Sequence, residues 1–141
     1  KRFLKNSAKK IKNFNKIYID RYDSQFNHCR IVNDSEIKNY LRKEGFKIVK
    51  LSKFSFQKQI SIFKNCKIVI GPHGAGMANL IFCRRKTKVV EIRPLGHPNN
   101  VYKRISKFNK LKHYLIRLEK IKNEKKGDML LDVKRLKYYL N

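Results

Sequence analysis

The residues with the clearest chemical potential form one short loop, Gly71-Pro72-His73-Gly74-Ala75-Gly76. Its three glycines let a ligand approach the backbone closely, and the proline stiffens the entry. A helix that begins in this loop has N–H groups without intrahelical partners and the positive end of the helix dipole, which together bind anions such as a diphosphate. The alternative is structural, because tight packing of a strand against a helix also requires small residues. On the pattern alone both interpretations remain open.

The spacing of the glycines excludes two familiar nucleotide-binding motifs. No Lys-Ser or Lys-Thr pair follows Gly76, as in a Walker A loop, and the Gly-x-Gly-x-x-Gly fingerprint of dinucleotide-binding proteins is absent. His28, His97 and His113 have no metal-ligand spacing with one another or with the cysteines, and no Asp-x-Asp pair occurs. We therefore expect no metal and no cofactor.

The elements that must position this loop follow from the apolar pattern. Short β-branched runs alternate with longer stretches of helical period, which predicts a Rossmann-like α/β domain with a mostly parallel sheet and helices on both faces. Strands are expected over residues 16–20, 46–50, 67–70, 88–92 and 113–116. The glycine loop directly follows the third strand. Ligands of open parallel sheets bind outside the carboxyl ends of the strands, so the loop is expected at the binding edge.

Helices are predicted between and beyond these strands. They are expected over residues 1–12, 34–43, a segment opened by Ser52 or Ser55, 74–83, 100–110 and 132–140. Gly45 is expected to end the second of them. Residues 93–100 are predicted to be a loop that can act as a lid, and residues 119–126 a solvated linker.

The helical period also predicts which side chains are buried. Each of three helices should direct one apolar face to the sheet. The expected inward residues are Phe56, Ile60 and Phe63, then Met77, Leu80 and Ile81, and finally Val133, Leu136 and Leu140.

The composition allows one domain and raises the question of a polyanionic partner. The chain has 141 residues and a formal net charge of +26. Such a charge attracts nucleic acid or an anionic membrane when the basic residues cluster. Here the lysines are spread over every segment together with many Ile and Asn residues, as AT-rich codons would produce. A codon bias therefore explains much of the charge without a partner, and weak, non-specific polyanion binding is compatible with it.

The cysteines and the apolar runs indicate where the protein works. Cys29, Cys66 and Cys83 form no Cys-x-x-Cys pair, so neither a zinc site nor a disulfide framework is predicted. No apolar run approaches the roughly 20 residues of a transmembrane helix, and no signal-peptide core is seen. We expect a cytoplasmic protein, at most peripheral at the inner face of a membrane.

A wider stretch of the sequence resembles a known family. The run GPHGAGMANLIF, preceded by KIVI and followed by VVEI, resembles the signature region of family 61 glycosyltransferases, which include capsular-polysaccharide enzymes and eukaryotic xylosyl- and N-acetylglucosaminyltransferases. The similarity extends from about residue 16 to the final helix. Upstream, the matching features are IYIDR, Arg30-Ile31-Val32-Asn33 with Glu36, Gly45-Phe46, and residues 56–63 with Gln59. The sequence departs from the family pattern at Asp34, Lys58, Met77 and Ala78.

The resemblance implies the carboxyl-terminal, nucleotide-binding half of a B-type glycosyltransferase. An acceptor domain would then precede Lys1, and the chain would be a fragment of a longer enzyme. The donor would be a nucleotide sugar, UDP-linked, and the acceptor a glycan in capsular or surface polysaccharide synthesis. Transfer would be inverting and metal-independent, with this chain neutralising the charge on the leaving diphosphate.

Two residues are the candidate catalytic groups, His73 and Arg21. His73 can donate to a phosphate or to the sugar ring, although a satisfied structural histidine is the alternative. Its place beside the leaving group argues against a role as the base. Arg21 follows the first strand and can clamp a phosphate with its forked donors, although surface solvation is possible in so basic a chain.

The candidate donor-binding residues have structural alternatives as well. Arg30 can bind a phosphate or be solvated, and Asn33 can bind the donor or cap the helix at Asp34. Glu91 can accept from ribose hydroxyls or pair with a buried lysine, and Asn79 is either polar support or exposed. Loop contacts complete the expected donor site: Gly71, Gly74, Ala75, Gly76 and Met77.

Two functional alternatives to an active transferase remain. One is a basic nucleic-acid-binding module in which the charge is the working feature, although no known reading motif is present. The other is an inactive relative that keeps only the fold.

Overall fold

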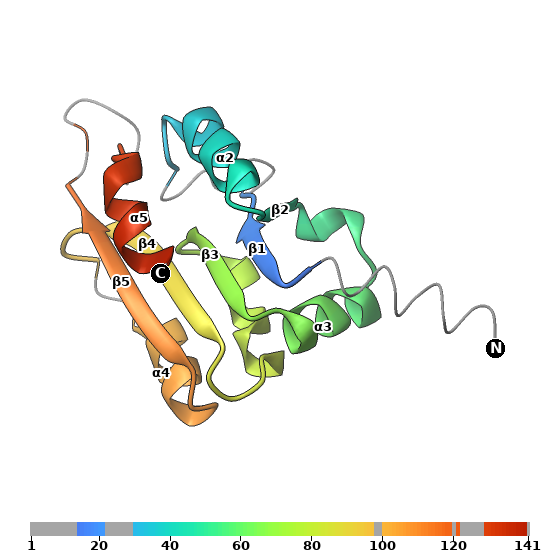
Figure 1. Ribbon diagram of the computed structural model, residues 1–141. Helices are drawn as coiled ribbons and strands as arrows, with labels where there is room; N and C mark the ends of the chain where they lie inside the picture. Colours follow the sequence, from blue (N-terminus) through green and yellow to red (C-terminus); the bar gives the residue numbers. More distant parts are fainter. Residues whose placement is uncertain (1–13, 22–29, 98–99, 120, 122–128, 141) are drawn as a thin grey trace.

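The computed structural model has five parallel strands in one sheet, in the order β2-β1-β3-β4-β5 (Figure 1). The structure describes residues 14–21, 30–97, 100–119, 121 and 129–140. The strands are Lys16–Ile19 (β1), Lys47–Val49 (β2), Ile68–Pro72 (β3), Lys88–Pro94 (β4) and Lys112–Leu118 (β5). The predicted α/β fold is therefore confirmed, and every described strand pair is parallel.

Helices cover both faces of the sheet. The helices α2 (Asp34–Lys43) and α5 (Val133–Leu140) pack on one face. The other face is covered by α3 (Phe56–Asn65), the 3-10 helix η2 (Ala75–Phe82) and α4 (Val101–Phe108). In Figure 1, α5 is drawn across β4 and β5 and α2 lies at the top of the view, whereas α3 and α4 lie in its lower half. A short 3-10 turn, η1 (Leu51–Lys53), follows β2.

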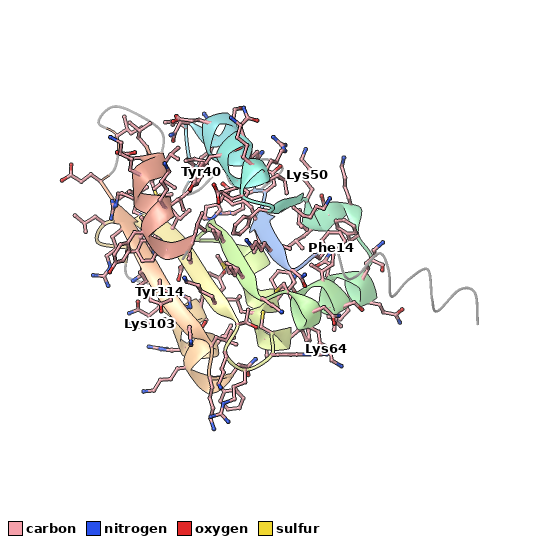
Figure 2. All side chains as sticks on the ribbon, in the orientation of Figure 1. Phe14, Tyr40, Lys50, Lys64, Lys103 and Tyr114 are labelled. Carbon is pink, nitrogen blue, oxygen red and sulfur yellow. The ribbon has the colours of Figure 1, made fainter. Side chains whose placement is uncertain are left out.

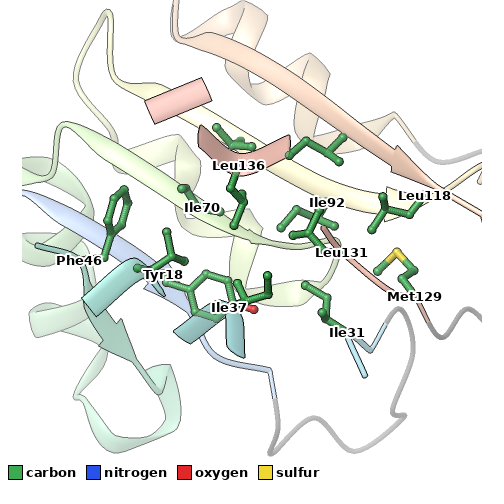
Figure 3. Packing of buried hydrophobic residues seen from close by; sticks show 13 residues of the cluster. Tyr18, Ile31, Ile37, Phe46, Ile70, Ile92, Leu118, Met129, Leu131 and Leu136 are labelled. Atoms are coloured by element: carbon green, nitrogen blue, oxygen red, sulfur yellow. The ribbon is translucent and has the colours of Figure 1, made fainter. Parts of the chain in front are cut away.

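The alternation of side chains along the strands divides the core into two layers. Tyr18 and Ile70 belong to the layer under α2 and α5, where they meet Ile37 and Leu136 (Figure 3). Their neighbours in the strands point the other way. Ile17, Ile19 and Val69 belong to the layer with α3, η2 and α4. Both layers are apolar, as expected for a parallel sheet buried on both sides.

Most predicted helix boundaries are confirmed. The helix α2 occupies the predicted range, and Gly45 follows it with φ +87°, in the left-handed region that glycine adopts without strain. Ser55 caps α3 by accepting a hydrogen bond from the N–H of Lys58 at 3.2 Å. In α5, Leu136 is fully buried and Val133 and Leu140 are partly buried.

Two predicted faces are partly wrong. Phe56 is 64% exposed, because the buried face of α3 is formed by Ile62 and Phe63. Ile81 is also exposed. The segment from Ala75 is a 3-10 helix with three residues per turn, so Cys83 follows Met77 and Leu80 on the buried side in its place.

Two strands run further than predicted. β3 continues through Gly71 and Pro72, which pair with Glu91 and Ile92, and β4 continues to Pro94. The predicted loop over residues 93–100 is therefore shorter, and its buried Arg93 belongs to the sheet. Residues 98–99, the predicted helix over 1–12 and most of the predicted linker over 119–126 lie outside the described residues.

Basic side chains are distributed over the surface of the described residues (Figure 2). Exposed lysines include Lys43 on α2, Lys64 on α3, Lys103 on α4, Lys112 on β5 and Lys137 on α5. Both helix layers and the edge strand β5 therefore contribute positive charge. No helix within the described ranges combines the length and the apolar character that crossing a membrane would require.

Candidate functional site

The carboxyl ends of β1 and β3 meet at the topological switch point of the sheet. From β1 the chain passes to β2 on one side, whereas β3 lies on the other side. The next described helices after β1 and β3, which are α2 and η2, lie on opposite faces of the sheet, and ligands of such sheets bind in the crevice at this point. Arg21 follows β1 and the glycine loop begins in the last two residues of β3, so the structure brings these two predicted site elements to the same place.

Arg21 is joined to the loop by a hydrogen bond. Its guanidinium donates to the backbone carbonyl of His73 and lies directly over the α-carbon of Gly74. A side chain at residue 74 would occupy the space of the guanidinium. Gly74 is thus small because an arginine covers it. The N–H groups of Gly74 and Gly76 meet no acceptor among the described residues, whereas the N–H of His73 donates to Ile92 O at 2.8 Å.

The other two glycines of the loop have a packing role. A β-carbon on Gly71 would lie 3.0 Å from Cβ of Ile19, and one on Gly76 would lie 3.1 Å from Cγ2 of the same residue. Both positions therefore need glycine for contact between η2, β3 and β1. Met77 is fully buried, and its Cε would lie 3.3 Å from a β-carbon on Gly71. The absence of a side chain at Gly71 and Gly76 therefore has a structural explanation.

A cleft of about 700 Å³ opens beside Arg21 on the α2 side of the sheet. Arg21 and Pro72 line it and connect it to the glycine loop. Arg30 lines it too and is exposed. Six basic residues contribute to its wall, and two carboxylates lie among the described lining residues, so the cleft is positive. The basic residues are Arg21, Arg30, Lys38, Arg42, Lys50 and Lys53.

Four polar side chains form a network in the wall of this cleft. Tyr18 donates its hydroxyl to Asp34 at 2.8 Å, and the ammonium of Lys38 contacts Asp34 at 2.6 Å and Asp20 at 3.0 Å. Burial lowers the pKa of Lys38, but its hydrogen bonds to Asp34 and Asp20 outweigh this and raise it. Tyr18, Asp20 and Lys38 are not among the site residues predicted from the sequence. The spacing of Asp34 and Lys38, four residues apart on one helix, was the available signal.

His73 is held from behind by Glu91. The imidazole is 7% exposed, and its Nδ1 lies 2.5 Å from Oε2 of Glu91. The ring centroid lies 4.4 Å from that of His97 and 4.8 Å from that of Tyr102. The ring is therefore fixed at the end of β3 by one charged hydrogen bond and two aromatic contacts.

Glu91 is 1% exposed and pairs with two histidines, not with the lysine considered from the sequence. Its Oε1 lies 2.9 Å from Nε2 of His113, whose Nδ1 lies 2.6 Å from the hydroxyl of Ser106. Burial raises the pKa of Glu91, but hydrogen bonds from His113 and His73 and their charges outweigh it and lower the pKa to about 2. Both carboxylate oxygens face histidines, so a contact with ribose would require this network to open.

Asn33 neither caps α2 nor lines the cleft. Its side chain makes no capping bond. Instead Nδ2 donates to Leu131 O at 2.7 Å, and Oδ1 accepts from the N–H of Leu131 at 3.1 Å. Beside it, Ile31 and Met129 form a parallel β-bridge. Asn33 thus ties the start of α2 to the segment before α5, a role that neither sequence-based interpretation included.

Asn79 takes part in hydrogen bonds that hold η2 in place. Its Nδ2 donates to Oε1 of Gln59 at 3.1 Å, and Gln59 donates in turn to Leu51 O at 2.8 Å and Phe54 O at 3.1 Å. These bonds connect η2 to α3 and to the turn η1. Of the two interpretations of Asn79, the structure agrees with polar support.

Comparison with known proteins identifies the family. The model of the family described as Glycosyltransferase 61 matches residues 1–90 of the chain. The chain belongs to glycosyltransferase family 61. The matched residues cover the strands β1, β2 and β3, the helices between them and the whole glycine loop. A search of curated proteins found no match.

In this family 61 glycosyltransferase, three of the residues that depart from the family pattern can be located relative to the cleft and to η2. Asp34 anchors Tyr18 and Lys38 in the wall of the cleft. The ammonium of Lys58 lies 5.5 Å above the ring of Phe54, beside the cleft. Ala78 is exposed on η2. Glu91 and His113, which hold His73 in position, lie beyond the matched range.

Proposed function

We propose that this family 61 glycosyltransferase binds a nucleotide sugar of the UDP class at the switch point between β1 and β3. The observation that carries the proposal is the bond from Arg21 to the His73 carbonyl. The guanidinium of Arg21 lies over Gly74, directly before η2, and the N–H groups of Gly74 and Gly76 make no hydrogen bond within the described residues. Guanidinium and free N–H groups together suit the two phosphates of the donor.

The nucleoside would occupy the neighbouring cleft. A volume of about 700 Å³ lies within the usual range for small-molecule sites, and the partly exposed ring of Phe54 in its lining offers aromatic surface to a base. Arg30, Lys50 and Lys53 line the same cleft and add positive charge. We therefore place the base and ribose on the α2 side of Arg21, and the sugar on the side of His73.

The proposed reaction is a metal-independent transfer with inversion. The acceptor hydroxyl loses its proton to a base, its oxygen bonds to the anomeric carbon, and the bond from that carbon to the diphosphate oxygen breaks. Arg21 and His73 would neutralise the charge that develops on the leaving diphosphate. In metal-dependent enzymes a bound metal ion performs this task. The base, the glycan acceptor of capsular or surface polysaccharide and the domain that holds it would lie outside this chain.

Titration of the full chain with UDP tests this proposal. We expect saturable binding at both low and moderate salt, weakened about 10- to 100-fold by Arg21→Ala, because charge-assisted hydrogen bonds are worth about 1.5–3 kcal/mol. Arg104 is an exposed arginine on α4, so Arg104→Ala is the matched control for charge. Equal loss in both variants, or binding of UDP no tighter than of an arbitrary oligonucleotide, would show that only the overall charge attracts the ligand.

A further inference from the structure

The pairing of Glu91 with two histidines determines which ring nitrogens carry hydrogen. An ionised carboxylate only accepts hydrogen bonds. The pKa of Glu91 lies at about 2, so it is ionised at neutral pH. Nδ1 of His73 and Nε2 of His113 must therefore both donate to it. In the neutral form of His113, Nδ1 then accepts from the hydroxyl of Ser106.

This assignment restricts what His73 can do with its other nitrogen. A neutral imidazole has one N–H group, and in His73 that group is used by Glu91. Nε2 of the neutral ring therefore has a lone pair and repels a phosphate oxygen. His73 can donate a hydrogen bond to a phosphate only when the ring is protonated at both nitrogens.

We infer that the buried chain Ser106–His113–Glu91 locks the tautomer of His73, so that donor binding is coupled to the uptake of one proton by His73. The proton comes from the solvent and forms the Nε2–H that donates to the diphosphate. This inference rests on the proposed function, since it requires the diphosphate to lie beside His73. Glu91 is then a positioning residue, as is the acidic member of a catalytic triad, and His113 and Ser106 hold Glu91 in place.

The charged groups around His73 agree with proton uptake on binding. Arg21 lies against its carbonyl from β1, and the rings of His97 and Tyr102 face it from the segment after β4 and from α4. In the free protein Arg21 opposes a second positive charge, while Glu91 favours one. A diphosphate adds negative charge beside both cations, which shifts this balance towards the imidazolium.

Calorimetric titration of the full chain with UDP measures the coupling directly. Titrations at pH 7.5–9, where the terminal phosphate of UDP is already ionised, are repeated in buffers of different ionisation enthalpy. We expect a net uptake of protons when UDP binds, and a Kd that rises with pH. In His73→Gln and Glu91→Gln the uptake should disappear or fall by more than half. Glu44→Gln changes an exposed glutamate after α2 and should leave it unchanged.

Nitrogen NMR of the free chain tests the tautomer of His73 without any nucleotide. If Glu91→Gln does not fold, Ser106→Ala is a milder change in the same buried chain. In the native chain, neutral His73 should carry its hydrogen on Nδ1. In Glu91→Gln we expect His73, and in Ser106→Ala we expect His113, to populate both tautomers. UDP binding without proton uptake, or an Nε2–H tautomer of neutral His73, would overturn the inference and leave the proposed function standing. Failure of UDP to bind, with the tautomer as expected, would overturn the proposed function and with it the coupling.

Discussion

The guanidinium of Arg21 covers the α-carbon of Gly74 and donates to the carbonyl of the preceding residue. Gly74 has φ 164°, an extended conformation that any residue can adopt. The requirement for glycine at this position is therefore spatial. The guanidinium of Arg21, which we propose binds the phosphates, fills the space that a side chain would need. The contact with Arg21, rather than backbone strain, explains the glycine.

Gly74→Ala should separate binding from stability. The added methyl group displaces the guanidinium of Arg21, which is the end of a flexible side chain and can move. We expect the free energy of unfolding to change by less than about 1 kcal/mol and the affinity for UDP to fall about tenfold. Urea denaturation and UDP titration measure the two effects. In an Arg21→Ala background the same change should cost no further affinity, and an additive loss would contradict this explanation.

Gly71→Ala should have the opposite profile. Its methyl group would lie 3.0 Å from Cβ of Ile19 and 3.3 Å from Cε of Met77, and the first of these atoms is attached to the backbone of β1. Overpacking of this kind costs about 1–3 kcal/mol of unfolding free energy. UDP affinity of the folded protein should be retained. Gly76→Ala meets the end of the Leu51 side chain and should cost less; a larger loss there would refute the packing argument.

Asn33→Ala should destabilise the protein without weakening UDP binding. The change leaves the N–H and the C=O of Leu131 without their partners, at a cost of about 1–3 kcal/mol. Thermal or urea unfolding measures this loss. Asn39 is an exposed residue of α2, so Asn39→Ala should change stability by no more than about 0.5 kcal/mol. A loss of UDP affinity in Asn33→Ala would favour the donor contact predicted from the sequence.

The buried pair of Glu91 and His73 should appear in the acid stability of the protein. The pKa of Glu91 is lowered from 4.5 to about 2 in the folded state, so its stabilising contribution is fully present above pH 4.5. It is lost as the pH falls from about 4.5 to 2, by up to about 3 kcal/mol. Urea unfolding between pH 6 and pH 3 measures the slope. Glu91→Gln should flatten it, and Glu44→Gln should not; an unchanged slope in Glu91→Gln would mean that other carboxylates dominate.

The sequence by itself determined the class of fold, the order of its elements and the family. These features are written in consecutive residues: the β-branched runs, the Ser55 cap, the glycine after α2 and the run from Gly71 to Phe82. Local patterns of this kind depend on the chemistry of neighbouring side chains, so they can be predicted before the chain is folded.

The buried face of a helix could be predicted only where the segment forms the expected α-helix. The prediction for residues 74–83 assumed 3.6 residues per turn, whereas η2 has three, and Ile81 is exposed for that reason. Gly71 and Gly76 pack closely against Ile19 at the start of this segment. Tertiary contact therefore decided a property that local periodicity suggested incorrectly.

Only the tertiary structure decided the partners of the site residues. Arg21 and His73 are 52 positions apart, Glu91 and His113 are 22 apart, and Asn33 and Leu131 are 98 apart. No local pattern connects such pairs, because the strand order places β1 beside β3 and β4 beside β5. A carboxylate expected to face ribose faces two histidines instead, since side chains on neighbouring parallel strands meet wherever the register of the sheet brings them together.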